Sequence, residues 1–365
     1  MANLRAGMVG IGSMGKNHVR NLRAIDGVDL VAIADASGKD PFGVAGDLPV
    51  LPDVDAVIET GIDYCVVAAP TKFHEEIGLK LAEAGVHALI EKPLAYDTAA
   101  ATRLAEAFES KGLVGAVGHI ERFNPALQSL RKRLENGDLG DLYQVATRRQ
   151  GPFPARIADV GVVKDLASHD IDLTAWVTQR EFELVAARTM FKAGRDYEDM
   201  VSATCQLSGG LMSNHLVNWL TPTKERRTFV TGEKGMFVAD TLTADLTFYS
   251  NAKVATVWDD IANFRGVAEG DVTRFAIPKP EPLRTEHENF RDAVLGKESD
   301  IVTMTQGATV VQVCEAMITS AATGEFVKSS GRSSGRAGPL RSGPILTSLL
   351  DFPCAPERPA APQVG

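Results

Sequence analysis

The sequence predicts an α/β protein in which a parallel sheet with crossover helices precedes a region of mainly antiparallel strands. Three observations predict this organisation. In residues 1–120, short apolar runs alternate with helical patterns, which is typical of βαβ units. From about Asn124 onward, strand-like runs follow one another at regular spacing with turn residues between them, which indicates an antiparallel sheet. The chain of 365 residues is long enough for two domains of ordinary size.

In the first part, apolar runs predict strands, and amphipathic or capped stretches between them predict helices. Ile77, Leu81 and Ala84 fall on one side of one helix, and Asp97 is of the residue type that caps the start of the next. The predicted strands are residues 5–9, 30–34, 64–69, 86–90 and 113–118. The first predicted helix follows the glycine-rich turn and ends near residue 24. Two further helices are predicted at residues 73–84 and 97–110.

In the second part, a helix at residues 125–135 is followed by a strand at 142–150 and a helix at about 165–177. Further strands are predicted at residues 184–190, 201–207, 211–220, 227–231, 235–239 and 246–250. Two helical patterns, at residues 283–294 and 304–323, close this part.

The composition changes after residue 328. Of the 37 residues 329–365, 17 are Pro, Gly or Ser, which is typical of a disordered tail. Such a tail is either a functionless extension or a partner-binding segment. We therefore expect a first domain over residues 1–122, a second over 123–328 and a tail over 329–365.

Composition and charge exclude several classes of protein. The chain has 47 acidic and 38 basic residues and a formal net charge of −9, which argues against nucleic-acid or membrane-surface partners. No apolar run approaches the roughly 18 residues of a membrane span, and no signal-peptide pattern precedes the first strand. The four cysteines lie far apart without a metal-binding spacing, so we expect no metal site, no disulfide and a cytoplasmic location.

A glycine-rich turn joins the first predicted strand to the first helix. It has the pattern GxGxxG, with glycines at Gly10, Gly12 and Gly15, and Asp35 ends the next strand. Gly10 permits a tight turn, Gly12 lets a pyrophosphate approach the backbone, and Gly15 lets the helix pack closely on the strand. In this context the pattern predicts a dinucleotide-binding Rossmann domain, and a tight turn without a ligand is the alternative.

Asp35 discriminates between the two nicotinamide cofactors. A carboxylate at this position accepts hydrogen bonds from ribose hydroxyls but repels a 2′-phosphate. Ala36 and Ser37 follow it, and no arginine lies nearby to receive a phosphate. The sequence therefore favours NAD over NADP, unless Asp35 only caps a turn.

Two further groups of residues can carry chemistry. Lys92, in Glu91-Lys92-Pro93, lies at the carboxyl end of a predicted strand, where parallel sheets bind their ligands, and a lysine there can carry a proton. Asp165, His169 and Asp172 share one face of a predicted helix beside an apolar stripe. Taken separately, each has an ordinary alternative, a surface lysine and a solvated helix face.

Together, these residues resemble the glucose–fructose oxidoreductase / inositol dehydrogenase / MocA family over residues 5–327, with Ala167 where the family usually has glycine. The resemblance implies a doubly wound Rossmann domain and a C-terminal α+β domain with an open, mainly antiparallel sheet. It implies NAD-dependent oxidation of a sugar or cyclitol hydroxyl, with Lys92, Asp165 and His169 as catalytic residues. Lys92 or His169 would take the hydroxyl proton, and Asp165 would orient or tune that base.

The same resemblance implies further contacts and partners. Within the family, residues 118–125 and 159–165 look most like the UDP-N-acetylglucosamine 3-dehydrogenase branch. This favours oxidation at carbon 3 of a nucleotide sugar or aminosugar, in an aminosugar or antibiotic pathway, by a homodimer or homotetramer. The expected cofactor contacts are Gly10, Gly12, Ser13, Met14, Gly15, Asp35, Ala69, Pro70, Thr71, His74, Glu91 and Lys92.

On the substrate side, arginines suit a diphosphate because they make bidentate, charge-assisted hydrogen bonds. We expect substrate contacts from Arg148, Arg149, Arg156 and Asp172, although solvated arginines on an edge strand are the alternative. Two other functions remain open. One is an inositol, free-sugar or aminoglycoside dehydrogenase, and the other, of a different class, is a non-catalytic NAD-binding sensor.

Overall fold

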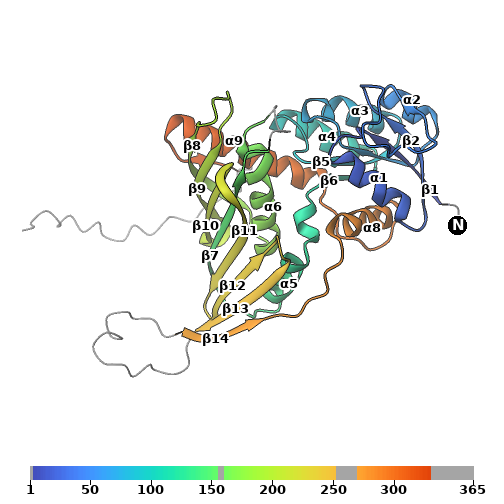
Figure 1. Cartoon of the computed structure of the whole chain (residues 1–365). Helices are drawn as coiled ribbons and strands as arrows, with labels where there is room; N and C mark the ends of the chain where they lie inside the picture. Colours follow the sequence, from blue (N-terminus) through green and yellow to red (C-terminus); the bar gives the residue numbers. More distant parts are fainter. Residues whose placement is uncertain (1–2, 155–159, 252–268, 330–365) are drawn as a thin grey trace, which may run out of the picture. The chain divides into compact units, whose positions relative to one another are not determined.

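A computed structural model describes residues 3–154, 160–251 and 269–329. Its first sheet is parallel throughout and has the strand order β3-β2-β1-β4-β5-β6 (Figure 1). The strand order reverses between β1 and β4, the switch point at which such sheets bind ligands. The strands are β1 (Leu4–Val9), β2 (Val28–Ala34), β3 (Val50–Leu51), β4 (Tyr64–Val67), β5 (His87–Glu91) and β6 (Gly115–Gly118).

Helices follow the strands of this sheet as the sequence predicts. Separate buried apolar clusters lie on its two faces, which is why its strands are apolar runs rather than alternating ones. The helices are α1 (Gly15–Ala24), α2 (Val54–Glu59), α3 (His74–Glu83) and α4 (Thr98–Ser110). The short elements β3 and α2 were not predicted, because two and six residues are too few to show a period.

The second sheet has nine strands in the order β14-β13-β12-β11-β7-β10-β9-β8-β15. All of its neighbouring pairs are antiparallel except β7 and β10, which are parallel. The strands are β7 (Leu142–Pro152), β8 (Phe182–Met190), β9 (Met200–Leu207), β10 (Met212–Asn218), β11 (Leu220–Gly232), β12 (Gly235–Asp240), β13 (Asp245–Asn251), β14 (Glu269–Arg274) and β15 (Val327–Lys328).

The single parallel pair arises because β10 and β11, consecutive in the chain, lie on opposite sides of β7. The mainly antiparallel expectation is therefore confirmed. The helices α5 (Pro125–Glu135), α6 (Ser168–Thr178) and α9 (Met304–Thr323) pack on this sheet around a third apolar cluster (Figure 1). None of the helices in the described ranges is long and apolar enough to cross a membrane.

Two C-terminal helices return to the first sheet. The helix α8 (Pro282–Val294) packs on α1, and α9 contacts α4 and β6 as well as β8. Both therefore lie beyond residue 122 in sequence yet complete the surroundings of the first sheet. The predicted division at residue 122 stays a prediction.

The body of the fold continues through Ser329. This residue is buried; its hydroxyl donates to the carbonyl of Phe182 at 2.6 Å, and its N–H donates to the carbonyl of Glu183. Composition alone had assigned Ser329 to the tail. Residues 330–365 lie outside the described residues.

Candidate active site

The glycine-rich turn has the backbone that a dinucleotide requires. Gly10 has a φ of 89°, in the region that favours glycine, and a Cβ at Gly15 would lie 2.0 Å from the carbonyl oxygen of Gly10. A Cβ at Gly12, in contrast, would meet nothing within 4 Å in the described chain. Gly10 and Gly15 thus have no room for a side chain, whereas the space above Gly12 is free in the described chain, as the approach of a pyrophosphate to the backbone requires. Ser13 and Met14 complete the turn before α1.

Asp35 is tied to this turn. One of its carboxylate oxygens accepts the N–H of Ile11 at 3.0 Å, and the other accepts the N–H and hydroxyl of Ser37. Partial burial raises the pKa of Asp35, but these hydrogen bonds outweigh it and leave the pKa below its usual value. Asp35 is therefore a fixed carboxylate beside the turn, where it can meet a ribose.

The segment after β4 lies beside the same turn. A Cβ on Gly10 would lie 2.8 Å from the backbone of Ala68. The predicted cofactor contacts Ala69, Pro70 and Thr71 come directly after Ala68 in the chain, so they lie close to the glycine-rich turn. The ring nitrogens of His74 contact the carbonyl oxygens of Ala69 at 2.8 Å and Pro93 at 2.9 Å. The imidazole of His74 is buried and ties the end of β4 to the turn after β5.

Glu91 fixes the backbone of Lys92. Its carboxylate accepts the N–H of Lys92 at 3.0 Å and contacts Nε2 of His18 at 2.9 Å. His18 in turn contacts Nε2 of His287 at 2.8 Å. Burial raises the pKa of Glu91, but the hydrogen bond and charge of His18, with Lys92, bring it below its usual value. Glu91 is thus a buried anchor between β5 and α1.

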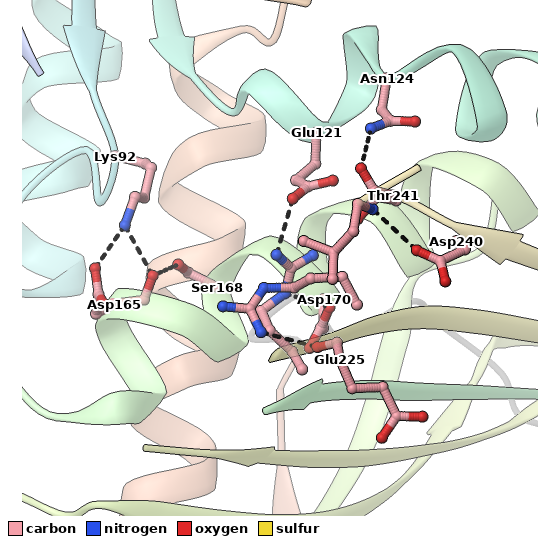
Figure 2. Close-up of polar contacts among 12 residues, drawn as sticks. Lys92, Glu121, Asn124, Asp165, Ser168, Asp170, Glu225, Asp240 and Thr241 are labelled. Carbon is pink, nitrogen blue, oxygen red and sulfur yellow. Dashed lines mark hydrogen bonds and ion pairs between the residues drawn. The ribbon is translucent and has the colours of Figure 1, made fainter. Parts of the chain in front are cut away.

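Lys92 reaches across to the second sheet's helices. Its Nζ donates to a carboxylate oxygen and to the backbone carbonyl of Asp165, both at 2.8 Å (Figure 2). Asp165 lies in a π-helical turn, Val163–Ala167, directly before α6, where the sequence predicted continuous α-helix. The pairing brings together Lys92 and Asp165, two of the three predicted catalytic residues.

His169 lies one turn further, in the first turn of α6. Burial lowers the pKa of His169 well below its usual value, and the charges of Lys92, Arg149, His119 and Arg226 act in the same direction. Its Nδ1 is buried and has no hydrogen-bond partner among the described residues. His169 is therefore a neutral imidazole at neutral pH, with a lone pair on one of its ring nitrogens.

Asp172 has a different environment from Asp165 and His169, the other two residues predicted on its helix face. Its two carboxylate oxygens accept Nε of Arg122 at 2.9 Å and Nη2 at 2.6 Å, and both side chains are buried. The structure thus directs Asp172 toward the 3₁₀ turn Ile120–Phe123 and gives it no contact with Lys92.

The predicted substrate arginines differ in their surroundings. Arg149 is buried, and its guanidinium donates to Asp170 at 2.9 Å and to Glu121 at 2.8 Å (Figure 2). Although burial opposes the charge, these two carboxylates raise the pKa of Arg149. Arg148 is exposed and lies 3.9 Å from Glu225. Arg156 lies outside the described residues.

Sequence reasoning missed Arg226. It lies on β11 directly opposite Arg149 on β7, and its charge contributes to the lowered pKa of His169, after burial. The predicted strand began at residue 227, whereas β11 begins at Leu220. The polar run Lys224-Glu225-Arg226-Arg227 was the only available signal, and it is more typical of a loop than of a strand.

Several known proteins are similar to this chain in sequence and fold. A UDP-N-acetylglucosamine 3-dehydrogenase of Acidithiobacillus ferrooxidans is 30% identical over 80% of this chain and 90% of its own length. Its solved structure matches with a TM-score of 0.76 at 27% identity, over 88% of this chain and 99% of that one. An inositol 2-dehydrogenase of Saccharopolyspora erythraea is 27% identical over 88% of this chain and 94% of its own. GenD2 from gentamicin A biosynthesis, solved with NAD, matches with a TM-score of 0.74 at 26% identity, over 90% of this chain and 97% of that one.

Two family models match successive segments of the chain. Residues 4–119 match the oxidoreductase family with an NAD-binding Rossmann fold, and residues 127–238 match the GFO/IDH/MocA C-terminal domain. The two matches cover the glycine-rich turn, Lys92, Asp165 and His169. The chain therefore belongs to the GFO/IDH/MocA family, whose members are NAD-dependent oxidoreductases that act on sugar hydroxyls.

Proposed function

We propose that this enzyme oxidises a secondary hydroxyl, at carbon 3, of a nucleotide-activated sugar or aminosugar to the ketone. The observation that carries the proposal is the Lys92 ammonium, held by Asp165 beside a neutral His169 at the ligand-binding edge of the Rossmann sheet. The likeness to a UDP-N-acetylglucosamine 3-dehydrogenase, at 30% identity, supports the substrate class.

Such an oxidation removes a proton from the hydroxyl oxygen and a hydride from the carbon, which becomes a carbonyl. Bound NAD supplies the hydride acceptor. With Lys92 as an ammonium, His169 takes the proton; with Lys92 as a neutral amine, Lys92 takes it, and in both cases Asp165 orients the lysine through two hydrogen bonds. A neutral His169 has a free lone pair for this proton, while a cationic Lys92 can stabilise negative charge that develops on the oxygen.

A second candidate substrate is a cyclitol, a free sugar or an aminoglycoside. It is favoured by the likeness to an inositol 2-dehydrogenase, at 27% identity over 88% of this chain. Under either candidate the protein is an enzyme, so the non-catalytic sensor is set aside. The cytoplasmic location, the place in an aminosugar or antibiotic pathway and the homodimer or homotetramer remain proposals.

The test measures NADH formation with UDP-N-acetylglucosamine, N-acetylglucosamine, myo-inositol and an aminoglycoside, each with NAD. We expect the nucleotide sugar to have the highest kcat/KM and the product to carry a ketone at carbon 3 by NMR. The Lys92→Ala enzyme in the same assay controls for contaminating dehydrogenases. Oxidation of the cyclitol or the aminoglycoside without oxidation of any UDP-sugar would contradict the nucleotide-sugar proposal and support the second candidate.

A further inference from the structure

Two arginines lie directly opposite each other on neighbouring strands. Arg149 of β7 and Arg226 of β11 are paired residues in the antiparallel ladder, and each is at least partly buried. Like charges in this position are destabilising in a sheet, and partial burial strengthens their repulsion. Their presence calls for groups that compensate both charges.

The structure compensates only one of them directly. Arg149 has two carboxylate partners, Asp170 and Glu121, at 2.9 and 2.8 Å. Arg226 donates from Nη1 to the carbonyl oxygens of Gln150 and Glu225 at 2.6 and 2.8 Å, and these acceptors carry no charge. In residues 3–154, 160–251 and 269–329, no carboxylate oxygen lies within 4.0 Å of its guanidinium.

This arginine is also electrostatically strained. Burial, together with the charge of Arg149, lowers the pKa of Arg226 below its usual value. An anion bound beside the guanidinium would relieve both effects, because it would replace lost hydration and offset the repulsion from Arg149. The two carbonyl contacts already hold Nη1 in place, so the guanidinium is oriented before a ligand arrives.

Its position connects it to the reaction. Arg149, its partner across the ladder, is bound by Asp170, which follows His169 in α6. Figure 2 draws Glu121, Asp170 and Glu225 in one close-up with the Lys92–Asp165 pair, and the charge of Arg226 acts on the pKa of His169. An anion held by Arg226 would therefore lie in the same charged cluster as Asp165 and His169.

We propose that Arg226 binds the diphosphate of the nucleotide-sugar substrate and so determines the preference for nucleotide-activated over free sugars. The proposal rests on the function proposed above for its substrate class. Arg149, across the ladder from Arg226, is already bound by two carboxylates. Of the predicted arginines, Arg148 lies on the opposite face of β7, since successive residues of a strand alternate in direction.

The chain offers a matched control in Arg227. It follows Arg226 in β11, so it lies on the opposite face, where it is exposed and pairs with Asp240 at 3.3 Å. Replacing Arg227 removes the same charge from the same strand without touching the inward face. The comparison therefore separates a specific diphosphate contact from a general loss of positive charge.

The experiment compares Arg226→Gln, Arg226→Lys and Arg227→Gln with the unaltered enzyme. Steady-state kinetics with UDP-N-acetylglucosamine give KM and kcat, and calorimetry with UDP alone gives binding without turnover. We expect Arg226→Gln to raise KM and the Kd for UDP by about ten- to a hundred-fold, with a smaller change in kcat. Arg226→Lys should recover part of the loss, and Arg227→Gln should match the unaltered enzyme.

The outcomes separate this proposal from the proposed function. If UDP-sugars are oxidised and Arg226→Gln leaves KM and UDP binding unchanged, the Arg226 site is wrong while the proposed function stands. A KM increase confined to a sugar acid without a nucleotide, such as glucuronate, would assign Arg226 to a carboxylate and overturn the diphosphate assignment. If UDP binds and Arg226→Gln abolishes binding although UDP-sugars are not oxidised, the site is supported and the proposed function fails. If the unaltered enzyme neither binds UDP nor oxidises a UDP-sugar, both fail.

Discussion

Around Lys92, neighbouring residues rather than residue type decide which groups carry charge. Lys92 is an ammonium bound to Asp165 by two hydrogen bonds, whereas burial and nearby cations keep His169 neutral. The two residues therefore offer different functions: a neutral imidazole can accept a proton, and an ammonium can stabilise negative charge on an oxygen.

Removal of either group should abolish most turnover. We expect Lys92→Ala and His169→Ala each to lower kcat by roughly a hundred- to ten-thousand-fold, the contribution of a positioned acid or base. NAD should still bind, since the glycine-rich turn is separate from both, and a fluorescence titration measures this. His87→Ala, at the opposite end of β5, is the control. A variant that keeps more than about a third of normal turnover would remove its residue from the chemistry.

Asp35 should set the choice of cofactor. Its carboxylate is fixed by Ile11 and Ser37, so it would meet a 2′-phosphate with a full negative charge. We expect higher kcat/KM with NAD than with NADP, and Asp35→Ser should narrow the difference. Thermal melting of the variant separates this effect from the loss of the Ile11 hydrogen bond. Equal efficiency with the two cofactors in the unaltered enzyme would contradict the prediction.

At the scale of elements, the start of α1 depends on two glycines for different reasons. A Cβ on Gly15 would lie 2.0 Å from a backbone oxygen that cannot move aside, whereas one on Gly12 would meet nothing in the described chain. Helix packing therefore requires Gly15, and ligand approach requires Gly12.

The two alanine variants should accordingly differ. Gly15→Ala should lower the melting temperature, because either β1 or α1 must shift. Gly12→Ala should melt near the normal temperature but bind NAD at least about tenfold more weakly, since its methyl group occupies the space needed by the pyrophosphate. Melting curves and NAD titrations on both variants check this. A Gly12→Ala enzyme with normal NAD affinity would show that the cofactor does not approach there.

At the scale of the whole molecule, the described chain is held together by α8 and α9, which return to the first sheet after the second sheet is complete. The last described contact is that of Ser329 and β15 with β8. Within the described residues, the fold therefore continues to Ser329.

Removal of residues 331–365 should leave the melting temperature and kcat/KM nearly unchanged. Their composition offers too little apolar surface to offset the entropy lost on ordering. A chain that ends at Phe326 is the matched control, because it also loses β15 and the buried hydrogen bond of Ser329, and it should melt at a lower temperature. A large loss of stability or activity in the chain that lacks only residues 331–365 would show that the tail packs on the enzyme.

The sequence by itself determined the parallel architecture of the first sheet, apart from β3, and the cofactor, whereas the catalytic roles of Lys92, Asp165 and His169 stay a prediction. Apolar runs, the pattern from Gly10 to Gly15 and Asp35 are local signals, and each depends on a few consecutive residues or on one strand and its turn. Lys92, Asp165 and His169 could be named because their motifs are short and resemble a known family. The sequence could not show that Lys92 and Asp165 lie in contact, since they are 73 residues apart.

Only the tertiary structure decided how the remaining charges are used. Asp172 pairs with Arg122, 50 residues away, and the π-helical turn before α6 interrupts the periodicity on which the predicted helix face depended. Arg148 and Arg149 look alike in sequence, yet alternation along β7 buries one and exposes the other. Arg226 lies opposite Arg149 only because β11 pairs with one edge of β7 while β10, which precedes it in the chain, pairs with the other edge. Pairing between strands so far apart in sequence leaves no local signal.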